Sequence, residues 1–147
     1  MMKLSTRTRY GVRMMLDLAR KYGSGPVLLK DVAHEEDLSE KYLSLIVLPL
    51  KASGLLKALR GSSGGYTLSR EPSEITLKEI VECLEGKIFL VDCVPDPKSC
   101  TRSGVCATRD VWQVVADKMT GTLESMTLAD LVRMSREKSG GSSNYNI

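Results

Sequence analysis

The apolar positions of residues 29–68 predict two short helices followed by a hairpin. A polar break at Glu36-Asp37 separates the helices, and Ser39 suits the N-cap of the second because its hydroxyl can accept from free backbone N–H groups. Gly54 can adopt the left-handed conformation that ends it. The apolar face of the second helix has i, i+3, i+4, i+7 spacing: Leu43, Ile46, Val47 and Leu50. Two helices joined by a short turn are typical of a helix-turn-helix.

A hairpin is expected directly after the second helix. An apolar run ends at Leu59, the glycine- and serine-rich residues 60–65 interrupt it, and residues 66–68 favour a strand. A hairpin in this place is the wing of a winged helix, with Arg60 at its tip, where a cation can enter a narrow minor groove. A helix pair and hairpin that serve only stability would give the same pattern.

The second helix contains a proline within its span. Pro49 removes one backbone donor there and should kink the helix.

Four further helices are expected, over about residues 8–22, 75–86, 107–123 and 127–138. The apolar stripe of the first is wide, so part of it is expected to face a second subunit. The helix over residues 107–123 is long enough to pair antiparallel with its copy in a dimer. The expected fold is therefore mainly α with a small β-hairpin: a winged helix-turn-helix plus a long dimerisation helix.

Length and composition fit one compact domain with a dimerisation arm. The chain has 147 residues, of which 42% are hydrophobic. We expect a DNA-binding domain over residues 1–72, a cysteine loop with dimerisation helices over residues 73–138, and a disordered polar tail over residues 139–147. The chain shows neither a membrane-length apolar stretch nor an apolar signal region, so we expect a cytoplasmic protein with no membrane partner.

Charge is distributed unevenly along the chain. The net charge is +3, but residues 1–70 hold 12 Lys and Arg against 6 Asp and Glu, whereas residues 71–147 hold 9 against 12. Basic charge attracts the phosphate backbone, and it coincides here with the helix-turn-helix. Four cations near the start of the first helix are expected either to contact phosphates or to be solvated: Lys3, Arg7, Arg9 and Arg13.

Three cysteines lie close together where helical periodicity fails, between about residues 86 and 105. Cys93, Cys100 and Cys106 fall within 14 residues and end next to a helix start. Thiolates are soft donors that can hold zinc or an iron–sulfur cluster, and the spacing leaves a metal cofactor and a redox or structural role equally open. Cys83 lies within the helix over residues 75–86 and is expected to act as a small buried hydrophobe.

Enzyme chemistry finds no support in the sequence. The chain carries no Cys-His pair, no Gly-rich nucleotide loop and no paired-carboxylate motif, so neither catalysis nor a small-molecule substrate is expected.

Several motifs spread along the chain fit one pattern: Arg9-Tyr10-Gly11, residues 38–43, residues 60–66, Leu84-Glu85-Gly86, the three cysteines, Trp112 and residues 127–131. Together they resemble the IscR, NsrR and CymR family of bacterial winged-helix transcription factors, from Met2 to about Lys138. The resemblance implies a homodimer that binds a roughly two-fold-symmetric double-stranded DNA operator. It also implies an iron–sulfur cluster on Cys93, Cys100 and Cys106, as in the IscR-like branch, whereas CymR-like members lack these cysteines.

The fourth ligand of such a cluster is open. IscR-like members use a histidine three residues after the last cysteine, where this chain has Arg109. NsrR-like members can use an acidic residue near the N-terminus of the partner subunit, where this chain has Arg9. Arginine stays protonated and cannot ligate a metal. Asp110 is the nearest carboxylate and becomes the candidate, and both 2Fe–2S and 4Fe–4S clusters remain open. His34, in the helix-turn-helix, is expected to be a surface or packing residue.

Six residues are expected to contact DNA. Ser39, Lys41, Tyr42 and Ser44 face the major groove or its phosphates, while Arg60 and Gly64 belong to the wing. Some IscR-like members read bases with a glutamate and a glutamine at the positions of Ser44 and Leu45, so the operator sequence should differ.

The expected function is transcriptional regulation, with operator binding modulated by a cluster that senses iron–sulfur status or redox or nitrosative stress. The alternative is a cluster-free winged-helix repressor with thiol- or zinc-based sensing.

Overall fold

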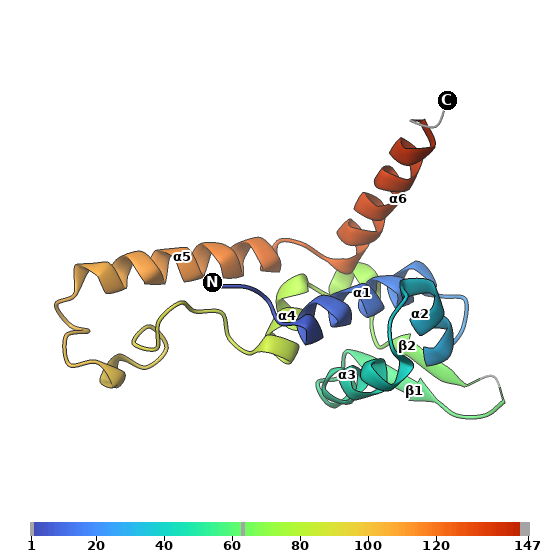
Figure 1. Cartoon of the computed structure of the whole chain (residues 1–147), viewed down its shortest axis with the longest axis horizontal. Helices are drawn as coiled ribbons and strands as arrows, with labels where there is room; N and C mark the ends of the chain where they lie inside the picture. The colour runs from blue at the N-terminus through green and yellow to red at the C-terminus, as the bar shows by residue number, and fades with distance from the viewer. Residues whose placement is uncertain (1, 63, 145–147) are drawn as a thin grey trace.

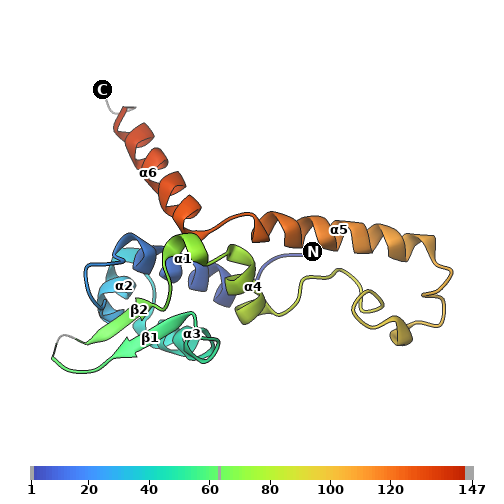
Figure 2. The same ribbon diagram turned by 180° about the vertical axis from the view of Figure 1, so that it is seen from behind.

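The structure, a computed structural model, describes residues 2–62 and 64–144. Its elements in chain order are α1 (Thr6–Arg20), α2 (Leu29–Glu36), α3 (Glu40–Ala52), β1 (Leu56–Leu59), β2 (Gly65–Leu68), η1 (Pro72–Glu74), α4 (Leu77–Glu85), η2 (Pro97–Ser99), α5 (Ala107–Glu124) and α6 (Leu128–Asn144). Helices α1 to α4 and the hairpin form a body, from which α5 and the loop before it extend to one side (Figures 1 and 2). The mainly α fold with a hairpin is confirmed.

The turn between α2 and α3 forms where the polar break predicted it. Asp37 ends α2 in the left-handed conformation, with φ 53°. The Ser39 hydroxyl then accepts from the Tyr42 backbone N–H at 3.2 Å and caps α3. Pro49 lies inside α3, but the helix continues to Ala52.

The wing is larger than a two-stranded hairpin. β1 and β2 pair antiparallel, with Leu56 opposite Leu68. Val27, which precedes α2, joins them through two 2.8 Å hydrogen bonds with the backbone of Tyr66. Sequence patterning missed this bridge because a single residue has no periodicity. Gly65 makes it possible, since a Cβ there would lie 2.5 Å from the Val27 carbonyl oxygen.

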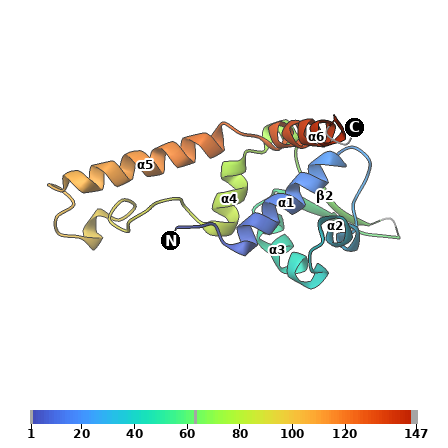
Figure 3. The ribbon, with the colours of Figure 1, turned by 45° about the horizontal axis from the view of Figure 1, so that its top comes forward.

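The core lies around α1, whose stripe meets most other elements. Met14 and Met15 are fully buried, together with Leu43 and Leu50 of α3 and Ile80 of α4. Figure 3 shows α1 running across this body, with α5 leaving it. Ala116 is the one buried residue that α5 contributes within the described part of the chain.

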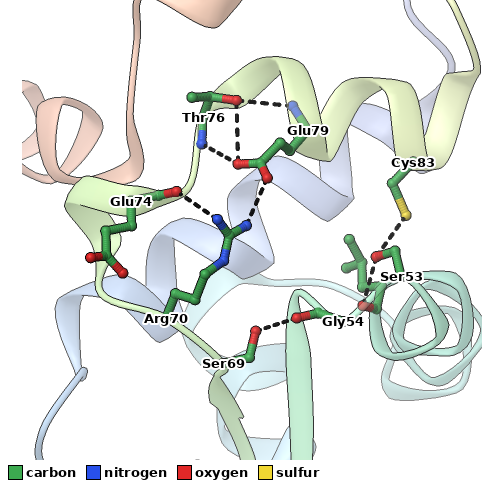
Figure 4. Close-up of polar contacts among 9 residues, drawn as sticks. Ser53, Gly54, Ser69, Arg70, Glu74, Thr76, Glu79 and Cys83 are labelled. Atoms are coloured by element: carbon green, nitrogen blue, oxygen red, sulfur yellow. Dashed lines mark hydrogen bonds and ion pairs between the residues drawn. The ribbon is translucent and has the colours of Figure 1, made fainter.

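Helices α1 and α4 touch closely at Gly11. A Cβ on Gly11 would lie 2.2 Å from Leu84 Cδ1 and 3.3 Å from Ile46 Cγ2. The start of α4 is fixed by a capping box, in which Thr76 and Glu79 exchange hydrogen bonds of 2.9 and 3.2 Å (Figure 4). This arrangement places the end of α4, and hence the start of the cysteine loop, against α1.

The predicted bounds of the first and the last helix are wrong. α1 begins at Thr6, two residues early, because the Ser5 hydroxyl accepts from the Thr8 N–H at 3.1 Å and caps the helix. α6 runs to Asn144, whereas we expected it to end near Lys138 with a disordered tail over residues 139–147. Once a helix is nucleated, each further residue adds a hydrogen bond, so even poor helix formers such as Gly and Ser can extend it. Residues 145–147 lie outside the described part of the chain.

Membrane insertion by a helix finds no support in the described residues, where every helix is too short or too polar to cross a bilayer.

Replacing Gly11 by valine should destabilise the fold, because the new side chain has to displace Leu84 from the core. We expect the free energy of unfolding to fall by about 1–3 kcal/mol, measured by urea denaturation. Gly121→Val in α5 is the matched control, since a Cβ there meets no atom within 4 Å. A comparable loss in both variants would contradict the close contact at Gly11.

Candidate functional site

The outward face of α3 is the candidate reading surface for DNA. Lys41, Ser44, Leu45 and Leu48 recur at i, i+3, i+4, i+7 and are all exposed, while the opposite stripe packs in the core. Lys41 is the cation at the N-terminal end of this face. The Ser44 hydroxyl donates to the Lys41 carbonyl at 2.6 Å, which leaves its oxygen free to accept.

The other two residues predicted on this helix are also engaged within the fold. Ser39 is exposed, but its hydroxyl caps α3. Tyr42 is half-buried and packs edge-on against Tyr10 of α1, with ring centroids 5.8 Å apart. Lys41 and Ser44 are therefore the two predicted α3 residues that lie on the outward face, and DNA contact by all four remains a prediction.

A groove of about 360 Å³ lies beside this face. Arg7, at the start of α1, lines it together with five residues of α3: Tyr42, Leu45, Ile46, Leu48 and Pro49. The other cations of α1 have partners within the fold. Arg9 donates to the Thr6 hydroxyl at 3.1 Å, and Arg13 pairs with the Glu36 carboxylate at 3.5 Å. Arg7 is thus the α1 cation that lies beside the reading surface. The sequence alone did not distinguish it from the other cations near the start of α1.

The wing presents Arg60 at its exposed tip. Gly64 accounts for the shape of this tip, because its N–H donates to the Gly61 carbonyl at 3.0 Å. A Cβ on Gly64 would lie 2.5 Å from the Leu59 carbonyl oxygen. Gly64 is therefore required by the turn that carries Arg60, and contact of either residue with DNA remains a prediction.

The cysteine loop joins α4 to α5 and contains one short 3₁₀ turn, η2. Cys93 and Cys106 are half-buried, Cys100 is exposed, and all have free thiols. In the described part of the chain, no three His, Cys, Asp or Glu side chains lie close enough together to hold a metal ion. The loop thus supplies the predicted donors without bringing them together.

Arg109 ties the loop to the start of α5. Its Nε donates to the Cys93 carbonyl at 2.8 Å and its Nη2 to the Val94 carbonyl at 3.3 Å. The residue that occupies the place of a histidine ligand therefore has a structural role of its own. Asp110 lies exposed in the first turn of α5, and His34 is exposed on α2 as expected.

Cys106 is the N-cap residue of α5. The pKa of its thiol is lowered, chiefly by the Thr108 hydroxyl at 3.1 Å and then by the Arg109 backbone N–H. A helix N-terminus generally favours the thiolate in this way.

The fourth cysteine connects α4 to the end of α3. The Cys83 thiol is half-buried and lies 3.4 Å from the Pro49 carbonyl, near the end of α3. It lies equally far from the hydroxyl of Ser53, which follows α3 (Figure 4). Its expected role as a small buried hydrophobe is therefore incomplete, because it also makes polar contacts.

Two residues later, the Glu85 carboxylate accepts from the hydroxyls of Ser5 and Thr8 at the start of α1. These bonds, with that from Thr8 the larger cause, lower the pKa of Glu85. No periodicity in the sequence marks either α4 contact, because both depend on how the helices cross.

Comparison with known proteins shows one consistent group. The family model of Rrf2, described as an iron-dependent transcriptional regulator, matches residues 4–134. The chain is 42% identical to the HTH-type transcriptional regulator CymR of Bacillus subtilis, over 88% of this chain and 89% of the relative.

Solved structures agree with this similarity. The solved structure of CymR, the global cysteine regulator of B. subtilis, has a TM-score of 0.78 at 41% identity, covering 91% of this chain and 98% of that one. IscR of T. potens has a TM-score of 0.77 at 37% identity, covering 93% and 90%.

Removing the Arg109 guanidinium should loosen the loop. In Arg109→Ala, we expect hydrogen exchange of the Val94 and Asp96 backbone amides to accelerate about tenfold, as two charge-assisted bonds to the adjacent carbonyls are lost. Arg102→Ala removes the same charge from an exposed position in the same loop and should leave these amides unchanged. Equal exchange in both variants would show that Arg109 does not hold the loop.

Proposed function

The chain belongs to the Rrf2 family, whose members are transcriptional regulators rather than enzymes, and we propose that it binds operator DNA as a homodimer under the control of an iron–sulfur cluster. The observation that carries the DNA-binding part is the outward stripe of α3 beside a wing tipped by Arg60, both in the basic half of the chain. In this geometry α3 enters the major groove and the wing reaches the adjacent minor groove.

The cations divide between two tasks. Lys41 and Arg7 flank the reading face and neutralise phosphates, which fixes the position of α3 without reading sequence. Arg60 enters the minor groove, where a narrow width strengthens the attraction for a cation. Ser39, Tyr42 and Ser44 complete the contacts on the helix, and Gly64 keeps the wing tip in shape.

Dimerisation uses α5. This helix has 18 residues and exposes Val111, Trp112 and Val114, which are 52, 39 and 56% exposed. A surface helix with such an apolar face gains from burial against another protein surface. A second copy of α5 packed antiparallel would bury both faces and relate the two α3 helices by a two-fold axis, as a two-fold-symmetric operator requires.

The cluster is supported by the donor set. Three thiols from one loop, outside the core, are soft ligands suited to iron–sulfur chemistry, and the family resemblance assigns them to a cluster. Cys93, Cys100 and Cys106 would hold it, and Asp110 is the candidate fourth ligand. A bound cluster supplies a redox-active group that oxidants and nitric oxide attack. The thiols are apart in this structure, so holding a cluster requires the loop to draw them together.

Helix α4 gives the loop a physical connection to the DNA-binding half. The loop leaves α4 at Gly86, one residue after Glu85 contacts α1 and three after Cys83 contacts the end of α3. A change in the loop that tilts α4 would therefore act on α3, which carries the reading face, and on α1 beside it. For such control, the two loop states must differ in their affinity for the DNA-bound dimer geometry.

A cluster-free regulator with thiol-based or zinc-based sensing is the second candidate. Two observations favour it: the similarity to CymR, a cysteine regulator, and the free thiols that are not grouped in the described residues. This second candidate has the same DNA-binding surface and the same dimer as the cluster-controlled regulator. The two differ only in what the cysteines bind or detect.

Losing the cation at the wing tip should weaken operator binding. For Arg60→Ala we expect a loss of about 1–3 kcal/mol in binding free energy and a salt slope smaller by about one, because a groove contact and its released counterion are removed. Fluorescence anisotropy with operator DNA over a salt series measures both, and analytical ultracentrifugation should show the dimer intact. Arg136→Ala on α6 removes an equal charge elsewhere. Identical affinities for Arg60→Ala and the unaltered protein would remove the wing from the interface.

The cluster is tested by the visible absorption spectrum of protein purified without oxygen, with iron and sulfide assays on the same sample. We expect brown protein containing sulfide, a colour lost in Cys100→Ala because a ligand is missing. Cys83→Ala is the matched control and should keep the colour, since this thiol lies on α4 against α3. Colourless protein without iron or sulfide, even after attempted reconstitution, would leave the regulator standing and favour thiol or zinc sensing.

A further inference from the structure

The reading face of α3 is unusually apolar for a surface that meets DNA. Leu45 and Leu48 are 58 and 62% exposed, although they lie in the middle of a helix whose other face is fully packed. Single exposed leucines are common on proteins, but these two are one turn apart and continue into the groove lined by Tyr42 and Pro49. Together they form an apolar strip, Leu45 and Leu48, at the centre of the candidate interface.

Hydrogen-bond donors are scarce beside this strip. The Ser44 hydroxyl already donates to the Lys41 carbonyl. The Ser39 hydroxyl accepts as the N-cap and keeps its own O–H, but it lies at the start of the helix, six residues before Leu45. The cations nearest the leucines along this side of α3, Lys41 and Lys51, lie one turn before Leu45 and one turn after Leu48. Direct hydrogen bonding from α3 to base edges is therefore limited, and sequence discrimination in the major groove has to come in part from apolar contact.

The strip is surrounded by positive charge that suits DNA. Lys41 lies one turn before it, Lys51 lies one turn after Leu48, and Arg7 lines the adjoining groove. Cations at the rim can hold phosphates while the strip faces the floor of the groove. This arrangement favours nucleic acid over an apolar protein partner, because such a partner would bring no charge to meet the lysines.

We propose that Leu45 and Leu48 read thymine by packing against its C5-methyl group. That methyl is the apolar group that base edges display in the major groove, and aliphatic side chains can discriminate it by contact. The inference rests on the proposed DNA-binding function and specifies how it selects a sequence. Each operator half-site should then contain thymines opposite Leu45 and Leu48.

The test uses the whole protein and begins with selection of preferred duplexes from a random DNA library. Each thymine of the selected site is then replaced singly by uracil, which pairs with adenine in the same way but lacks the methyl group. At one or two positions in each half-site, we expect affinity to fall about fourfold, the size of one buried methyl group. Fluorescence anisotropy at fixed salt measures the change.

Variants of the two leucines show which leucine is responsible for the loss of affinity at each uracil position. Leu45→Ala and Leu48→Ala should bind thymine and uracil duplexes equally at the position each reads, whereas Leu45→Met, which keeps an apolar side chain of similar volume, should retain the discrimination. Circular dichroism checks that these exposed substitutions leave the fold unchanged.

The other outcomes are distinct. Specific binding that is insensitive to uracil at every position would overturn thymine reading while leaving the regulator intact. A leucine variant that alters the oligomeric state without altering uracil sensitivity would instead assign the strip to a protein interface. Failure to enrich any sequence, with no DNA affinity above that of unrelated duplexes, would remove the proposed function itself.

Discussion

The close contact between α1 and α4 at Gly11 determines how the rest of the structure is arranged. Because position 11 lacks a side chain, Leu84 can occupy the space next to the α1 backbone, within reach of Ile46 on α3. Three helices therefore meet at one point. Glu85 closes the contact by accepting from Ser5 and Thr8, so the last turn of α4 is fixed to the first turn of α1. Loss of this contact would free the last turn of α4, and with it the start of the cysteine loop, from α1.

Through that junction, α4 connects the cysteine loop to α1 and α3. On one side it meets α1 and the end of α3, through Glu85 and Cys83, and on the other it leads into the cysteine loop and packs against α5. The loop itself lies outside the hydrophobic core and is held by polar contacts, such as those of Arg109. A loop held by few contacts can change shape without unfolding the domain, and a firmly packed helix can transmit the change, as the proposed control of operator binding requires.

Helix α3 satisfies two requirements on opposite faces. Its core face is apolar and completely buried, which fixes its orientation, and its outward face combines cations with two exposed leucines. Leu45 and Leu48 are more than half exposed and add little to the core, so the outward face carries an apolar strip that the proposed thymine contact would use. The wing complements this surface through Arg60, whose position depends on Gly64 and on the bridge between Val27 and Tyr66.

The sequence by itself determined the local elements. Helical periodicity, the caps at Ser39 and Thr76 and the glycine-rich break at the wing depend on residues close together in the chain, so patterns could predict them. It also identified the cysteine loop and the candidate reading helix. Only the tertiary structure decided the contacts that join them: Leu84 beside Gly11, Glu85 with Ser5, Cys83 with Ser53, and Arg109 with the Cys93 carbonyl. Most of these pairs are far apart in sequence, and all depend on how packed helices cross or how the loop folds back, so no local spacing encodes them.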